Sequence, residues 1–509
     1  MIVCPSCGAN LKFNPKSQKL MCDFCGSEFD PHQFDSDKDA QETQINTQEY
    51  GSSTDETPEV KDDTYKITVF TCPQCGGELA SVDENTAATF CSFCGASTIL
   101  HSRIAKSKRP EYIIPFSITK EDCKEAYSRV VKKALFLPKE YRSVEYIDGF
   151  RGIYMPYWSY DVEQNGNVNL KGERSHRSGD YIITDHYALT GKIDAFYEGL
   201  SYDASSSFSD NISEALKPFD VTKRIPFQPS YMSGYYADLP DVASSLYAED
   251  AAGMAYDRSV ERIKKETAEF HKYSIAEDKI ENRPNAPGRA FSSKTVKAHS
   301  SMYPVWFLSY RNGDRVTYAT VNGQTGKVAA DLPIDVKKYL IGSGIIAVVI
   351  FMLLNMFLVL TPKVVLALAA TLTLLVFIIN AIQRSSIKKA ESGEDDRGLM
   401  HARNKERLKN KKRNADNTGS DELPKPPEVP EATMTGAEKI ILWTGIAILA
   451  VNVLVAFFIQ PVSDIPYYLL CIVDAVVFCF SFRFTLINYN LMATRRLPQF
   501  DRKGGDDRA

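Results

Sequence analysis

The sequence predicts a multi-domain chain with two small β-type cysteine units, a cytosolic α+β region and four transmembrane α-helices arranged as two hairpins. Three observations support this prediction. Paired cysteines occur twice within the first 100 residues, and apolar runs occur only after residue 338. Between them, helix-like and strand-like patterns alternate. At 509 residues the chain is also too long for one ordinary domain.

The bulk composition points to a reducing compartment. The net charge is −4, which does not favour a polyanion as the partner of the whole molecule. The start, "MIVCPSCGAN", lacks the charged and apolar regions of a secretory signal. Eight of the 11 cysteines form four C-x-x-C pairs, and Cys123, Cys471 and Cys479 lie in apolar-patterned segments. This usage predicts metal binding and not a disulfide framework.

The paired cysteines have the spacing of a metal site. The first unit reads C-x2-C-x14-C-x2-C and the second C-x2-C-x15-C-x2-C. Zn²⁺ prefers four soft ligands at tetrahedral corners, and a C-x-x-C turn presents two thiolates on one side. Because protein fills all four positions, we expect two structural zinc ions. Their predicted ligands are Cys4, Cys7, Cys22, Cys25, Cys72, Cys75, Cys91 and Cys94.

Three alternatives for these cysteines have less support. A disulfide scaffold does not suit a reducing compartment. Both spacers are short for iron in a rubredoxin-like site. A catalytic dithiol would require one reactive pair in a thioredoxin-like context, which the sequence does not show.

Several stretches resemble known protein groups. The motifs "CPSCG…CDFCGSEF" and "CPQCG…CSFCGAS" resemble zinc ribbons of the transcription factor B type. The stretches "YIIPFSITKEDCKEAY", "GIYMPYWSYDV" and "YPVWFLSYRNG" resemble an uncharacterised group of Firmicute zinc-ribbon membrane proteins over most of the chain. The resemblance implies zinc and a membrane, but the group has no settled activity. Some members are named after the primosomal helicase, yet this sequence has no G-x-x-x-x-G-K-[ST] loop.

Composition changes along the chain predict eight segments. They are zinc ribbon 1 (1–29), an acidic disordered linker (30–66), zinc ribbon 2 (67–100), the cytosolic α+β domain (110–335), transmembrane hairpin 1 (340–382), a basic and disordered cytoplasmic loop (383–438), transmembrane hairpin 2 (439–486) and a cytoplasmic tail (487–509).

The linker carries a strong negative charge. Positions 35–63 hold ten Asp/Glu and two Lys with few apolar residues, which is typical of disorder. This charge would repel nucleic acid and weighs against a DNA clamp formed by both ribbons. The basic stretch "HSRIAKSKRP" that follows the second ribbon is interpreted as a plain linker.

The α+β region shows recognisable elements. A helix is expected over "TKEDCKEAYSRVVKKAL", with Thr119 as its cap and Cys123 in its buried face. A second helix is expected at about 241–271. Strand-like runs occupy 153–162, 181–189 and 192–199, and a hairpin turn is expected at Asn312-Gly313-Asp314.

Functional constellations are sparse in this region. Pro156-x-Trp158 and Pro304-x-Trp306 suggest two related β-lobes, either with core tryptophans or with a ligand groove. We find no HExxH, G-x-S-x-G or glycine-rich phosphate loop in the sequence. The sequence therefore predicts that the protein is not an enzyme.

Four apolar runs have the length of membrane spans. They cover 340–360, 364–382, 439–459 and 467–486. The two short connectors hold one basic residue between them, whereas residues 397–413 hold eight Lys/Arg. By the positive-inside rule the basic loop and both termini are cytoplasmic, so we expect a multi-pass protein of the cell membrane.

Two features near the membrane allow more than one interpretation. Residues 397–413 are able to contact anionic lipid headgroups, to bind nucleic acid phosphates or only to fix the topology. Asp474 lies in the middle of the fourth span and is either part of an ion relay or a hydrogen-bonded packing residue. Its candidate partners are Asn355, Asn380, Asn452 and Arg483.

These observations favour a non-catalytic interaction or scaffold protein anchored at the cytoplasmic face of the bilayer, with another protein as its partner. The alternative is a membrane-linked nucleic-acid-binding protein that acts in transcription or replication through the ribbons. A transporter or enzyme that uses Asp474 has the least support.

Overall fold

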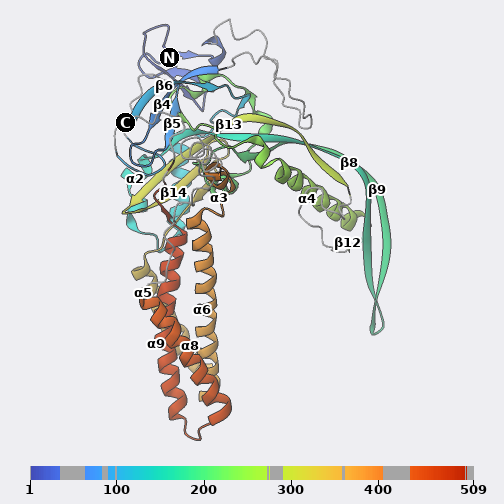
Figure 1. Ribbon diagram of the computed structural model, residues 1–509, viewed down its shortest axis with the longest axis vertical. Helices are drawn as coiled ribbons and strands as arrows, with labels where there is room; N and C mark the ends of the chain where they lie inside the picture. Colours follow the sequence, from blue (N-terminus) through green and yellow to red (C-terminus); the bar gives the residue numbers. More distant parts are fainter. Residues whose placement is uncertain are drawn as a thin grey trace, which may run out of the picture.

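The computed structural model describes residues 2–34, 64–82, 90–97, 100–271, 274–275, 291–357, 361–404, 436–498 and 500. A sheet-rich region lies at one end, and the long apolar helices extend from it (Figure 1). Most of the predicted acidic linker lies outside the described residues, as does the predicted basic loop from residue 405 to residue 435.

The strands that the structure describes are distributed from the N-terminal cysteine unit to the C-terminal tail. Their bounds are β1 Leu11–Asn14, β2 Lys19–Cys22, β3 Glu28–Phe29, β4 Thr64–Thr71, β5 Glu78–Ser81, β6 His101–Lys108, β7 Tyr112–Ile113, β8 Arg151–Ser178, β9 Tyr181–Asp203, β10 Ile225–Pro226, β11 Tyr236–Ala237, β12 Ser274–Ile275, β13 Ser292–Asn312, β14 Arg315–Asn322, β15 Val328–Ala330 and β16 Arg495–Arg496.

The helices include four long ones near the C-terminal end. The α-helices are α1 Lys120–Lys133, α2 Val144–Asp148, α3 Asp210–Leu216, α4 Ala248–Glu266, α5 Val336–Phe357, α6 Pro362–Ser392, α8 Gly436–Val453 and α9 Ile465–Met492. Short 3₁₀ or π turns are η1 Pro31–Phe34, η2 Lys139–Arg142, η3 Val221–Lys223, η4 Pro229–Met232, η5 Ser244–Leu246, η6 Thr267–His271 and η7 Leu454–Ile459.

Two sheets organise the region. The first cysteine unit forms the three-stranded sheet β1-β2-β3. The large sheet has the order β10-β7-β13-β8-β11-β5-β4-β6, with β9 and β12 paired to β8 and with β14 paired to β13. Its central pair, β8 and β13, is antiparallel and long. Buried aromatic side chains fill the space around this pair.

The two Pro-x-Trp stretches lie in neighbouring strands and not in two separate lobes. Pro156 pairs with Met302, and Pro304 pairs with Tyr154 in the β8–β13 ladder. Both indole N–H groups donate to backbone carbonyls, at 2.9 Å in each case. The tryptophans are therefore packing residues at the centre of one sheet, and the expectation of two lobes was wrong.

β8 and β9 form one long hairpin that projects away from the region (Figure 1). The predicted runs at 181–189 and 192–199 both belong to β9. Thr190 and Gly191 continue the ladder between them, because they pair with Asn169 and Val168. A glycine inside a paired strand does not necessarily end it.

The first predicted helix is confirmed. Thr119 forms a capping box with Asp122, and the Cys123 side chain is buried. The second predicted helix begins later than expected, at Ala248, because the short turn η5 and the non-helical N-cap residue Tyr247 precede it. The predicted turn at 312–314 joins β13 to β14, and Gly313 adopts the positive φ that such a turn requires.

The large sheet crosses the predicted boundary between ribbon 2 and the α+β region. β4 pairs along its whole length with β6, so residues 101–108 of the predicted linker at 101–110 form an edge strand. β5 in turn pairs with β11. Strands β4 and β5 of the second cysteine unit are thus part of the large sheet. Its hydrophobic side chains pack in the same core as those of β8 and β13.

The four long apolar helices have the length and composition of membrane spans. α6 continues to Ser392, and residues 397–404 are helical, so the predicted basic loop begins later than residue 383. α6, α8 and α9 pack together, as the hydrogen bond between Asn380 and Thr485 illustrates. α5 reaches α9 through the rings of Tyr339 and Phe482, whose centroids lie 6.2 Å apart.

A buried histidine links strands β13 and β8 to the residue that precedes β7. His299 on β13 is 4% exposed. Its Nδ1 lies 2.6 Å from a Glu111 carboxylate oxygen, and its Nε2 lies 3.2 Å from Asp161 Oδ2. Burial opposes protonation, but the hydrogen bonds to Asp161 and Glu111 outweigh it and raise the pKa of His299 to about 9.

This pKa predicts a loss of stability in alkaline solution. A raised histidine pKa stabilises the fold fully below the unfolded value near 6.5, and this contribution disappears as the pH rises through about 9. We expect about 3 kcal/mol to be lost over this interval. Thermal unfolding of the full chain between pH 6 and pH 10 measures it. The H299Q variant should show a much flatter profile, and an unchanged profile would contradict the assignment.

Candidate metal centres

All four C-x-x-C motifs fold into the same tight turn. In the first motif, the Cys4 N–H donates to the Ala9 carbonyl at 2.7 Å, and the Gly8 N–H donates to the Cys4 carbonyl at 2.8 Å. The other three motifs repeat both bonds. The glycine after each second cysteine has a positive φ between 69° and 75° that a side chain would strain. These glycines are Gly8, Gly26, Gly76 and Gly95.

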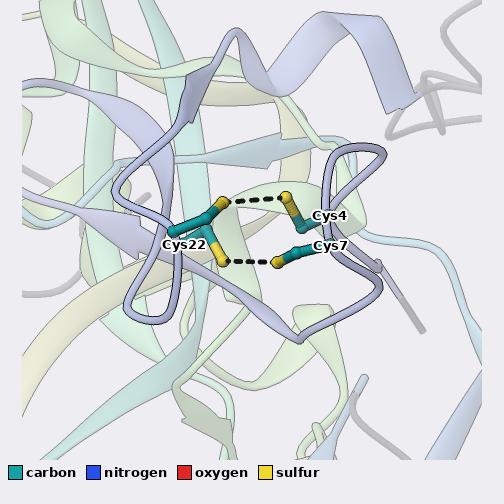
Figure 2. Close-up of side chains that lie close together, drawn as sticks. Cys4, Cys7 and Cys22 are labelled. Carbon is teal, nitrogen blue, oxygen red and sulfur yellow. Dashed lines mark hydrogen bonds between the residues drawn. The ribbon is translucent and has the colours of Figure 1, made fainter.

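The turns bring the first four cysteines together (Figure 2). Cys4 Sγ lies 3.6 Å from Cys25 Sγ, and Cys7 Sγ lies 3.5 Å from Cys22 Sγ. Four thiolates about 2.3 Å from a central ion would lie about 3.8 Å apart, and a disulfide would bring two sulfurs to about 2.04 Å. The spacing fits a tetrahedral metal site and not a disulfide.

The second unit has the same arrangement. Cys72 Sγ lies 3.8 Å from Cys94 Sγ, and Cys75 Sγ lies 3.6 Å from Cys91 Sγ. In each unit all four sulfurs lie within 4.8 Å of one another. The structure therefore gathers the eight predicted ligands into two groups that are each able to hold a metal ion. Four cysteine sulfurs leave no coordination position open for a substrate.

One cysteine of the first unit shows how the local polar groups favour a thiolate. The Ser27 hydroxyl lies 3.3 Å from Cys25 Sγ. Hydrogen bonds from the side chain and backbone of Ser27 lower the pKa of the Cys25 thiol to about 6. A thiolate is the form that binds metal.

The two sites differ in burial. In the second site Cys72, Cys75, Cys91 and Cys94 are all buried. In the first site Cys7 and Cys25 are exposed, while their two partners are buried. The first site therefore has one face toward solvent, whereas the second is enclosed.

The C-terminal tail covers the second site. β16 pairs with β14, and the Phe500 N–H donates to the Cys75 carbonyl at 2.7 Å. The Phe500 ring packs on Phe93 with centroids 5.5 Å apart. The Phe500 carbonyl also lies where a side chain at Gly76 would have to go. The sequence did not predict this contact, because its only signal was an aromatic residue within a polar tail.

The hairpin of β1 and β2 packs the first site on the sheet-rich region. The second C-x-x-C turn of the site faces solvent. The Phe13 N–H donates to the Ser233 carbonyl at 3.0 Å, and Gln18 donates to the Phe116 carbonyl at 2.8 Å. On the other side Phe24, inside the second C-x-x-C turn, is 84% exposed. Asp23, the residue before Phe24, lies 2.6 Å from the Lys12 ammonium.

The start of the predicted basic segment binds the sheet-rich region. The Arg397 N–H donates to Asp210 at 2.8 Å, its guanidinium pairs with Asp250, and it lies over the Tyr247 ring. Arg397 is therefore engaged by groups of the protein, although about half of its side chain is exposed. The proposed lipid contact of residues 405–413 lies outside the described residues.

Asp474 has the partner that a carboxylate inside a membrane span needs. The Asn452 Nδ2 lies 2.9 Å and 2.7 Å from the two Asp474 oxygens, and the Asp474 side chain is fully buried. Of the four candidates from the sequence, the structure selects Asn452. A pair between α8 and α9 has the geometry of a packing contact.

The Asn452–Asp474 pair predicts different effects on thermal stability for substitutions of its two members. N452L leaves the Asp474 carboxylate without this donor and is expected to lower the thermal stability of the detergent-purified chain by several degrees. D474N keeps hydrogen-bonding capacity and is expected to change it little. If D474N instead abolished the cellular phenotype at unchanged stability and assembly, Asp474 would belong to a relay and not only to packing.

The fold and the two cysteine sites together place this chain in a class of proteins that combine metal-binding cysteine groups with apolar helices. The chain has two four-cysteine groups able to hold metal ions, a sheet-rich region and four helices long enough to cross a membrane.

A relative of this chain is the uncharacterized protein YdjG of Bacillus subtilis strain 168. It is 28% identical over 322 residues, which cover 53% of this chain and 91% of the relative. No family model and no solved structure matches the chain. The relative is a distant one and is itself uncharacterised, so it adds no activity.

Proposed function

We propose that the protein is a membrane-anchored zinc-ribbon scaffold whose first ribbon binds a protein partner at the cytoplasmic face. In this proposal both sites hold zinc, which four cysteines at tetrahedral spacing favour. The basic segment and both termini are cytoplasmic, as the distribution of Lys and Arg predicts.

The contrast between the two sites is the observation that carries the proposal. The second site is enclosed by the large sheet and by Phe500, so it supports the fold. The first site is attached by one side and presents Phe24 to solvent. A large aromatic side chain on a rigid, metal-held turn is a suitable anchor for a partner, because little conformational entropy is lost on binding.

Nucleic acid is the less favoured partner. Two of the three lysines of ribbon 1 already have acidic partners, since Lys12 pairs with Asp23 and Lys19 lies 3.8 Å from Glu28. On the second unit, Arg103 of the edge strand pairs with Glu78. A phosphate backbone would have to break these pairs to gain its own contacts.

Site-specific crosslinking tests this proposal. A photoreactive phenylalanine analogue at position 24 of the full chain, in native membranes, should capture a discrete protein partner. The F24S variant should reduce co-purification of that partner at least about tenfold, as expected for an anchor residue.

The matched control is I104S, because Ile104 is also an exposed apolar residue, at 70%, on β6. It should leave partner binding unchanged. Equal binding by F24S and the wild type would contradict the proposal. Crosslinks that disappear with nuclease or at high salt would favour nucleic acid instead.

A further inference from the structure

The hairpin of β8 and β9 extends far beyond the large sheet. The last β8 residue in the described ladder with β13 is Asn165, whereas the pairing of β8 with β9 continues to Ser178 and Tyr181. The intervening stretch of β8 spans about 43 Å at ~3.3 Å per residue. In Figure 1 the hairpin bends over, and its tip points in the same direction as the apolar helices. The tip lies at the level of these helices along the long axis of the molecule, not at the level of the sheet-rich region.

The tip carries a run of exposed apolar side chains. Tyr181 and Ile182 are 77% and 76% exposed, and the next residue, Ile183, is 43% exposed. Among the described residues outside the four apolar helices, no other three consecutive large apolar side chains are exposed. Contiguous apolar surface in contact with water marks an interaction site.

These side chains lie on both faces of the hairpin. Ile182 lies between Tyr181 and Ile183 in the ladder with β8. Because successive side chains of a strand point to opposite faces, Ile182 projects from one face and its two neighbours from the other. A docking surface for a protein needs only one apolar face. A tip that is apolar on both faces suits an apolar medium that surrounds it.

The charged groups near the tip do not form a basic patch. Residues 172–187 hold three Asp/Glu, two Arg and two His. One of the acidic groups already faces a histidine, since His176 Nδ1 lies 3.6 Å from Asp185 Oδ2. Attraction to anionic headgroups is therefore weak, and the burial of apolar surface is the main driving force. Asp180 in the turn keeps any insertion shallow, because a charged side chain is costly in hydrocarbon.

We propose that the tip of this hairpin, residues 181–183, inserts into the interfacial layer of the bilayer that the apolar helices cross. A tyrosine such as Tyr181 suits this layer, because its ring enters the apolar part while its hydroxyl remains at the headgroups. Ile182 and Ile183 supply the apolar surface that becomes buried. The hairpin is then a second membrane contact that fixes the orientation of the sheet-rich region. This inference rests on the proposed anchoring in a membrane, but not on the partner of ribbon 1.

Depth-dependent fluorescence quenching tests the proposal. A fluorescent amino acid replaces Tyr181 in the full chain, which is reconstituted in phosphatidylcholine bilayers. Lipids with a spin label near the top of the acyl chain should quench this reporter at least about fivefold more than the same reporter at Phe196. Phe196 is also an exposed residue of β9, but it lies far from the tip. A third reporter, at the exposed Leu353 of α5, checks that the helices themselves are in the bilayer.

A matched pair of variants tests the apolar contact. I182D should reduce the quenching of the reporter at position 181 at least about fivefold, because it removes apolar surface and adds a charge at the interface. F196D adds the same carboxylate to β9 away from the tip and should leave the quenching unchanged. Both positions are exposed, so both variants should stay folded, which thermal unfolding checks.

The outcomes separate this proposal from its alternatives. Quenching at position 353 but not at 181 would overturn the insertion of the tip and leave the membrane anchoring intact, whereas no quenching at either position would contradict both. A reporter at position 181 that is shielded from aqueous iodide, yet is not quenched by the labelled lipids, would show that protein covers the tip. That result would also overturn the proposal.

Discussion

Replacing Cys91 with serine is expected to disrupt the sheet-rich region as a whole, not only the second ribbon. Cys91 is 1% exposed, and its sulfur lies 3.6 Å from Cys75 Sγ. The four cysteines share a core with Ile153 of β8 and Phe307 of β13. A structural zinc site contributes about 10–16 kcal/mol, which is comparable with the ~5–15 kcal/mol that stabilise a whole domain.

The C91S chain should therefore lose its cooperative thermal transition and aggregate. The matched control is C123S, which makes the same chemical change at a fully buried cysteine outside both sites. It should cost only about 1–3 kcal/mol, the penalty for a buried hydroxyl with poor hydrogen bonding. If C91S unfolded at the same temperature as C123S, the second site would not support the fold.

Cys22→Ser is expected to have an equally complete but local effect. Cys22 lies at the end of β2 and pairs with Leu11 in the small sheet. One face of that sheet packs on the rest of the protein, because its buried side chains share a core with Tyr154 of β8 and Trp306 of β13, and Phe13 and Gln18 add hydrogen bonds. Loss of metal should release residues 2–34 from this shared core while the large sheet stays folded, because small ribbons depend on their metal for order.

Hydrogen exchange of the full chain measures this effect. In C22S the amides of β1 and β2 should lose protection by more than about 100-fold, while those of β8 and β13 keep theirs. C25S, which removes another ligand of the same site, should give the same pattern. Spread of the change into β8 and β13 would mean that the core they share with ribbon 1 depends on the first metal site.

Much of the architecture could be predicted from local patterns. The capping box at Thr119 and the turn at Gly313 depend on neighbouring residues, and the apolar runs reflect the demands of a bilayer. The cysteine groups were equally predictable, because metal geometry restricts both the spacing of the ligands and the glycines that follow them.

The features that could not be predicted depend on contacts between distant segments. Pairing of β4 with β6 joins the second ribbon to the large sheet, and only the ladder register reveals it. The contact of Phe500 with Phe93 spans about 400 positions of sequence and has no local signature. The different exposure of the two cysteine sites follows from these contacts, so the contrast in their roles required the structure.

Metal analysis of the intact protein tests the central claim most directly. Full-length protein purified without oxygen or chelators should contain two zinc ions per chain, one for each four-cysteine group. C22S should retain one zinc ion and keep the large sheet folded. Wild-type protein that is folded yet contains no zinc, or that holds a different metal in both sites, would contradict the account.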